Sequence, residues 1–185
     1  MRKLVAIVCA LAFVAGAQAA DVGGVKLNDK ESVGGQELVL NGAGIRTKLM
    51  FKVYVGSLYL PAKATTAAAV YAKGPRRVQL NMLRDVTADQ MMDALSEGVT
   101  NGNPAADVAA VKAQTAELAT IMKSIGPLKE GNVVTFDFVD GGTKVSFNGA
   151  AKGTIAGEAF NKALMNAWIG DSPVQADLKK AMLGG

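Results

Sequence analysis

The order of the predicted strands and helices along this chain limits its possible folds more than any other feature. Predicted strands dominate the chain up to about residue 83, helices follow over about 88–125, strands return over 133–155, and two helices close the chain. Because the two kinds of element come in blocks, a doubly wound parallel sheet is not expected. The order predicts one α+β domain, an antiparallel sheet with helices packed on one face.

Local signals mark where the two middle helices begin. Thr87, followed three residues later by Gln90, matches a capping box, in which each side chain bonds a free amide of the first helical turn. Asn103 followed by Pro104 predicts the start of a second helix, with the asparagine as its cap and the proline in its first position. That helix is expected to run without a break to Gly126.

The stretch Asn41–Leu60 holds most of the candidate functional residues. Its first part is rich in glycine around Arg46 and is predicted to be a flexible turn that presents a guanidinium beside an apolar strand. The strand that follows alternates between apolar and polar residues until Gly56, where a bulge is expected. Tyr54 and Tyr59 point to opposite faces of this strand if the bulge is absent.

The first 19 residues have the pattern of a secretory signal peptide. A basic start precedes an apolar run of 11 residues, Leu4–Val14, and a small-residue cleavage site follows at Ala17-Gln18-Ala19. The run is shorter than the roughly 20 residues that span a bilayer. We therefore expect a signal peptide over 1–19, a single domain over 20–185, a periplasmic location, and no stable membrane insertion after cleavage.

Composition excludes several classes of chemistry. The chain has no histidine, and its one cysteine, Cys9, lies in the predicted signal peptide. Histidine bases, thiolate nucleophiles and the histidine and thiolate metal sites are thereby excluded from the exported domain. Without Arg2 and Lys3 the chain keeps 18 basic and 16 acidic residues, scattered along it, so nucleic-acid binding is not expected. We expect no cofactor and no metal.

Several segments carry a resemblance to one family, in the same order and over nearly the whole exported chain. They are Gly42-Ala43-Gly44-Ile45-Arg46, Lys52-Val53-Tyr54, Leu58-Tyr59-Leu60, Leu83-Arg84-Asp85-Val86, Asn166-Ala167-Trp168-Ile169-Gly170 and Pro173-Val174-Gln175-Ala176-Asp177-Leu178-Lys179-Lys180. With these segments the chain resembles the chalcone isomerase family, most closely its secreted bacterial branch, called chalcone isomerase-like. The resemblance implies an open-faced β-sandwich, with a ligand cleft between a large antiparallel sheet and the helices that cover it.

The resemblance also implies roles for single residues. In the plant enzymes, which close a chalcone to a flavanone, a glycine-flanked arginine is catalytic, and Arg46 matches it. Tyr54 falls where the family has a strand threonine, and Met91 falls near the position of a helix tyrosine. Gly98 and Ala167 fall near positions where the family has an asparagine and a hydroxyl-bearing residue. Of these family positions, only the arginine is retained. The residues therefore do not favour isomerase activity.

Other members of the family bind fatty acids without catalysis, with the arginine and a tyrosine holding the carboxylate. Arg46 with Tyr54 or Tyr59 matches that arrangement, and Met91 suits the wall of an adaptable lipid tunnel. Both tyrosines also suit a half-buried strand that has no role in binding, and Met91 equally suits a core.

Three hypotheses follow. The first is a periplasmic, non-catalytic binder of a fatty acid or a similar small amphipathic acid, with the ligand-binding residues Arg46, Tyr54, Tyr59 and Met91. The second is a weak intramolecular lyase or isomerase acting on an enone such as a chalcone, with Arg46 stabilising negative charge on oxygen. The third is an accessory protein of the cell envelope without a small ligand. The oligomeric state is not predicted.

Overall fold

The computed structural model describes residues 20–72 and 74–185. The predicted signal peptide over 1–19 lies outside the described residues and stays a prediction. Within the described residues, no helix is long and apolar enough to cross a membrane.

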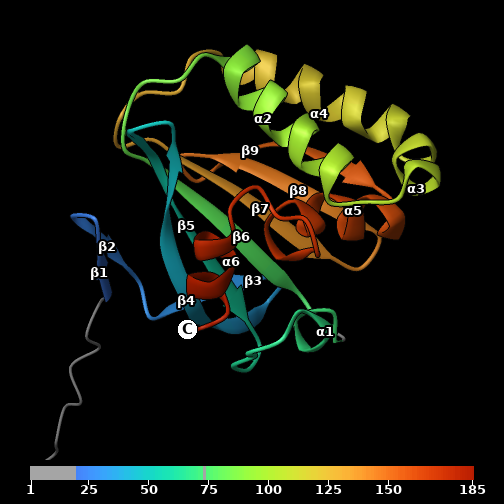
Figure 1. Ribbon diagram of the computed structural model, residues 1–185. Coiled ribbons are helices and arrows are strands. Elements are labelled where there is room, and N and C mark those ends of the chain that lie inside the picture. The colour runs from blue at the N-terminus through green and yellow to red at the C-terminus, as the bar shows by residue number, and fades with distance from the viewer. Residues whose placement is uncertain (1–19, 73) are drawn as a thin grey trace, which may run out of the picture.

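A seven-stranded antiparallel sheet forms the body of the protein, and its strands follow one another in chain order, from β3 to β9 (Figure 1). Each strand therefore pairs with its neighbour in the sequence. The strands are β3 (Lys30–Val33), β4 (Gln36–Lys48), β5 (Phe51–Leu60), β6 (Arg76–Met82), β7 (Val133–Val139), β8 (Gly142–Phe147) and β9 (Ala150–Ala156). A separate two-stranded ribbon, β1 (Ala20–Val22) and β2 (Val25–Leu27), precedes them.

Helices pack on one face of this sheet, as the sequence predicts. They are α1 (Ala67–Val70), α2 (Ala88–Asn101), α3 (Ala105–Ala110), α4 (Lys112–Ile125), α5 (Glu158–Ile169) and α6 (Ala176–Met182). α2 packs against α4 and α5, while α4 contacts β9 and α5 contacts β8. α6 packs mainly against β4 and β5, with a smaller contact to α5 (Figure 1). The predicted α+β class and open-faced sheet are confirmed.

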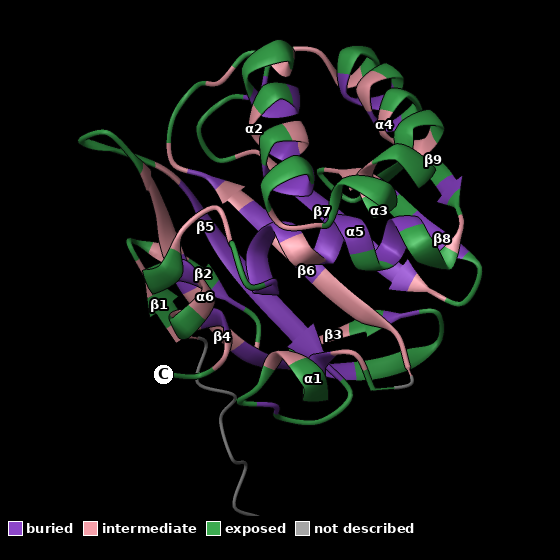
Figure 2. Ribbon diagram, turned by 45° about the vertical axis from the view of Figure 1, so that its right-hand side comes forward, coloured by how far each residue is buried: buried purple, intermediate pink, exposed green. Residues whose placement is uncertain are grey.

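Two apolar clusters lie on the two faces of the sheet. The larger one fills the space between sheet and helices and includes Phe136, Leu164 and Trp168. The smaller one, around Leu38 and Tyr59, lies on the opposite face, with residues of the β1–β2 ribbon packed against it. Strand β5 is therefore buried on both sides over residues 54–60, while the outer surfaces of α2 and α4 face solvent (Figure 2).

The two predicted helix starts have different outcomes. The capping box is confirmed: the Thr87 hydroxyl accepts from the Gln90 amide, and the Gln90 side chain accepts from the Thr87 amide. Asn103 is not a cap, because its side-chain amide donates to carbonyls of Val99 and Ala163 and so ties α2 to α5. The expected single helix is also interrupted at Val111, between α3 and α4.

The predicted flexible turn around Arg46 is wrong, because these residues continue strand β4 through to Lys48. The glycines serve a close approach of α6 instead. A Cβ added at Gly42 would lie 2.1 Å from the carbonyl oxygen of Ala181, and one at Gly44 would lie 2.7 Å from the Ala181 Cβ. Gly42 and Gly44 therefore let a helix rest directly on the strand that carries Arg46.

The predicted bulge at Gly56 is also wrong. The register of β4 against β5 shifts at Asn41 and at Val53, while residues 54–60 of β5 alternate without interruption. Tyr54 and Tyr59 consequently point to opposite faces of the sheet. Tyr54 belongs to the larger cluster, under the helices, and Tyr59 to the smaller one.

Substitution of Gly42 by alanine tests the close approach of α6. We expect Gly42→Ala to lower the free energy of unfolding by about 1–3 kcal/mol, because the new methyl group meets backbone atoms that cannot move aside. Gly153→Ala is the matched control, since a Cβ there meets only the Ile121 side chain. Urea unfolding measures both, and an equal effect of the two substitutions would contradict this explanation of the glycines.

Candidate functional site

A cavity of about 280 Å³ lies between the β4–β5 hairpin and the helices α2 and α5. Its volume is near the lower end of the range for ligand pockets, roughly 300–1,000 Å³. The lining is mainly apolar, with a few polar groups. It consists of Arg46, Lys48, Leu49, Phe51, Val53, Tyr54, Arg84, Asp85, Val86, Gln90, Met91, Ala94, Leu95, Ala167, Trp168 and Val174.

Arg46 and Tyr54 face this cavity from neighbouring strands. They are direct partners in the register of β4 and β5, so their side chains lie on the same face of the sheet. Arg46 is partly buried, and it forms no ion pair with a carboxylate of the described residues. The chemistry of a partly buried guanidinium without a counter-ion suits it to an anion, which would offset the cost of burying its charge.

Gln175, just before α6, positions the arginine. Its side-chain oxygen accepts hydrogen bonds from the Thr47 amide at 2.8 Å and from Nη1 of Arg46 at 3.2 Å. Its side-chain nitrogen donates to the Ile45 carbonyl at 3.2 Å. Arg46 Nη1 also donates to the Thr47 carbonyl at 2.5 Å. These bonds use one end of the guanidinium fork and fix its direction.

The Tyr54 hydroxyl is the second polar group in the cavity wall. It accepts a hydrogen bond of 3.1 Å from the indole nitrogen of Trp168, which leaves its own proton free to be donated. Burial raises the pKa of Tyr54, against the smaller lowering effects of the Trp168 hydrogen bond and the Arg46 charge. Tyr54 is therefore a neutral hydrogen-bond donor at physiological pH.

The helix side of the cavity is apolar. Met91, from the first turns of α2, and Ala167, from α5, both line it. Gly98 does not line the cavity, and a Cβ there would lie 2.7 Å from the Ala167 Cβ, so this glycine lets α2 and α5 approach each other. The helices thus offer few hydrogen-bonding groups to the cavity. Arg46 and Tyr54, its main polar groups, come from the sheet.

The rim of the cavity carries more basic than acidic groups. Lys48 and Arg84 lie there, and the Arg84 guanidinium stacks 4.4 Å from the centre of the Phe51 ring. Asp85 is the acidic member of the lining. The pKa of its carboxyl is lowered by hydrogen bonds from the Lys129 ammonium, at 2.7 Å, and from the Glu130 amide. Its charge is already balanced, so the rim stays positive.

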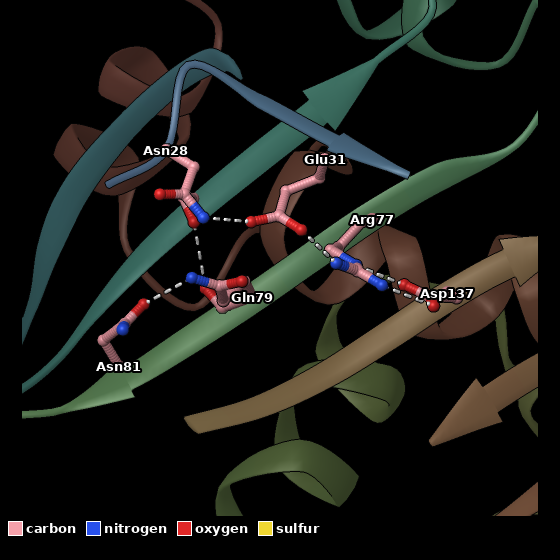
Figure 3. Close-up of polar contacts among 7 residues, drawn as sticks. Asn28, Glu31, Arg77, Gln79, Asn81 and Asp137 are labelled. Carbon is pink, nitrogen blue, oxygen red and sulfur yellow. Dashed lines mark hydrogen bonds and ion pairs between the residues drawn. The ribbon is translucent and has the colours of Figure 1, made fainter. Parts of the chain in front are cut away.

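Tyr59 is not brought to the cavity, because it lies on the opposite face of the sheet. There it is the cross-strand partner of Arg77, which forms two hydrogen bonds with Asp137 at 2.6 and 2.8 Å and a third with Glu31 at 2.8 Å (Figure 3). The Asp137 hydrogen bond is the main reason that the pKa of Arg77 is raised. The charges of Arg77, Asp137 and Glu31 are therefore paired with one another on this face of the sheet.

Of the four residues that the sequence indicates, three line the cavity: Arg46, Tyr54 and Met91. Sequence reasoning did not assign roles to Gln175 and Trp168, although both belong to segments that carry the family resemblance. The described residues contain no group of three histidine, cysteine, aspartate or glutamate side chains placed to hold a metal ion.

Comparison with known proteins places the chain in a family. The family model described as chalcone isomerase-like matches residues 19–184. The chain belongs to the chalcone isomerase-like family. A crystal structure of a fatty-acid binding protein from Arabidopsis thaliana is similar, with a TM-score of 0.68 and 13% sequence identity, over 86% of this chain and 92% of that one. No curated protein sequence matches the chain. At this identity, the structural likeness shows the fold.

Alkaline unfolding tests the burial of Tyr59. Burial, with the nearby Glu31 charge, raises the pKa of Tyr59 to about 12, while in the unfolded chain the hydroxyl ionises near pH 10. The unfolded state therefore holds fewer protons between these values, and stability falls as the pH rises through this window. We expect Tyr59→Phe to lose less stability than the wild type between pH 9 and 11 in urea unfolding. An equal loss of stability in Tyr59→Phe and in the wild type would contradict the raised pKa of Tyr59.

Proposed function

We propose that this chalcone isomerase-like protein binds a fatty acid or a similar small amphipathic acid in the cavity, without catalysis. The ligand carboxylate lies at Arg46 and accepts a hydrogen bond from Tyr54. The tail lies between the sheet and the helices α2 and α5, against Met91 and Ala167. The signal-peptide pattern over 1–19 supports a periplasmic location as part of the same proposal.

One observation carries this proposal: Arg46, which has no counter-ion among the described residues, and the neutral Tyr54 hydroxyl lie side by side in the wall of a mainly apolar cavity. A carboxylate satisfies both, because it offers two oxygens to a guanidinium fork and a phenol. The apolar remainder of the lining suits an alkyl chain, which it removes from water. The fatty-acid binding protein of similar fold supports the same assignment.

The contacts of the head group give the first test. Decanoate is titrated into the purified protein by calorimetry. We expect Arg46→Ala to raise the Kd about 10–100-fold, since charge-assisted hydrogen bonds contribute about 1.5–3 kcal/mol. Tyr54→Phe should raise the Kd about 3–10-fold, through loss of one neutral hydrogen bond of about 0.5–1.5 kcal/mol.

Tyr59→Phe is the matched control, because it removes the same atom from the same strand on the opposite face of the sheet. We expect it to change the Kd less than about twofold, in keeping with the small effects of substitutions away from a site. Decanoate binding by Arg46→Ala as tight as that of the wild type would remove the basis of the proposal.

The length of the ligand tail gives the second test. Each buried methylene contributes about 0.8 kcal/mol, which corresponds to about a fourfold change in Kd. Neighbouring members of the series hexanoate, octanoate and decanoate differ by two methylenes, so we expect the Kd to fall about 15-fold at each step, and less once the chain outgrows the cavity. Ala94→Phe, which places a ring in the cavity and leaves Arg46 and Tyr54 intact, should abolish the length dependence. An affinity independent of length would place the tail outside the cavity.

The two other hypotheses predict different results. An intramolecular lyase acting on an enone would consume a chalcone, which absorbance detects, and the reaction would depend on Arg46. An envelope accessory protein without a ligand would yield no lipid when the purified protein is extracted with organic solvent and examined by mass spectrometry. The apolar residues Met91 and Ala167 supply no hydrogen bonds to orient a polyphenol, which favours the non-catalytic binder.

A further inference from the structure

The turn between β4 and β5 exposes a run of three large apolar side chains. Leu49 and Met50 are each 89% exposed and Phe51 is 53% exposed, and these are the large exposed hydrophobic residues of the described chain. Figure 2 shows this turn as an exposed tip at the edge of the molecule. Large apolar residues gathered on a surface projection are typical of a contact with a membrane or a partner.

The backbone of the turn indicates that local folding does not favour a leucine at position 49. Leu49 has a φ of 57°, a left-handed conformation that favours glycine or asparagine and strains other residues. The turn comprises two residues, Leu49 and Met50, between the paired residues Lys48 and Phe51. A glycine or an asparagine would make this turn more stable, so the leucine side chain serves another purpose.

The charges around the tip are mainly positive. Lys48 and Lys52 flank it in the sequence, both exposed, and the Arg84 guanidinium lies against Phe51. The acidic groups at this end are Asp85, paired with Lys129, and the neighbouring Glu130. Apolar side chains surrounded by cations complement the surface of a bilayer that contains anionic lipids: the cations meet the head groups and the apolar residues enter the acyl boundary.

The tip is also continuous with the cavity. Lys48, Leu49 and Phe51 line the cavity together with Arg46. A bilayer contacted by the tip would therefore lie directly at the cavity opening. Such an arrangement gives an amphipathic acid a path between lipid and cavity without passage through bulk water.

We propose that the β4–β5 turn docks the protein on anionic lipid bilayers through insertion of Leu49, Met50 and Phe51. Docking itself does not depend on what the cavity binds. Its use for loading or delivering an acid rests on the proposed function.

Vesicle binding tests the docking surface. The purified protein is sedimented with vesicles of phosphatidylcholine alone and with vesicles that contain 30% phosphatidylglycerol. We expect at least tenfold tighter binding to the anionic vesicles. Met50→Asp should weaken that binding at least tenfold, because it removes an inserted side chain and adds a repelled charge. Met50 does not line the cavity, so decanoate binding in solution reports separately on the proposed function.

Ala150→Asp is the matched control, because it makes the same change of charge at another exposed apolar residue, in β9 at the far edge of the sheet. We expect it to weaken vesicle binding less than twofold. Equal losses in the two variants would reduce the effect to net charge and overturn the proposal, as would absence of binding to anionic vesicles by the wild type. Equal binding to both kinds of vesicle would overturn the role of the cations.

Insertion is measured directly with Met50→Trp. We expect its emission to move to shorter wavelength when anionic vesicles are added, while the buried Trp168 supplies a constant background. Ala150→Trp should show no such shift. A Met50→Trp spectrum unchanged by vesicles that sediment the protein would show that another surface, not this turn, enters the lipid.

Discussion

The pairing of β4 with β5 is the interaction on which the rest of the site depends. It sets Arg46 directly opposite Tyr54, so that a cation and a neutral phenol reach the same cavity from adjacent strands. The register shift at Val53 lies next to this pair. A slip of one residue between the strands would move one of the two side chains to the other face of the sheet. The placement of Arg46 beside Tyr54 is therefore set by the backbone hydrogen bonding of the two strands.

Two other features hold this pairing in place. On the helix face, α6 rests on Gly42 and Gly44, and Gln175 bonds the edge of β4 while it orients the guanidinium. On the opposite face, the small apolar cluster around Tyr59 and the Arg77–Asp137 pair close the sheet from behind. Arg46 and Tyr54 thus lie on strands that are packed on both faces. The exposed turn beyond them, Leu49 and Met50, is free to contact other surfaces.

The sequence predicts the fold class and most of the elements, because the order of strands and helices and the Thr87 capping box are local signals. It also indicates Arg46, Tyr54 and Met91, which the structure brings to one cavity. The sequence-based predictions are wrong where contacts between distant segments of the chain determine the local structure. The glycines around Arg46 favour a turn locally, but α6, more than 130 residues later in the chain, requires them in a strand. The roles of Gln175 and Trp168 likewise depend on contacts between distant segments.

A crystal structure with a medium-chain fatty acid brominated at its terminal carbon shows whether Arg46 and Tyr54 hold a carboxylate in the cavity. We expect carboxylate oxygens within hydrogen-bond distance of Arg46 and Tyr54, and an anomalous bromine signal between β5 and the helices α2 and α5. A ligand bound with its carboxylate in solvent, or a bromine signal on the far face near Tyr59, would contradict it.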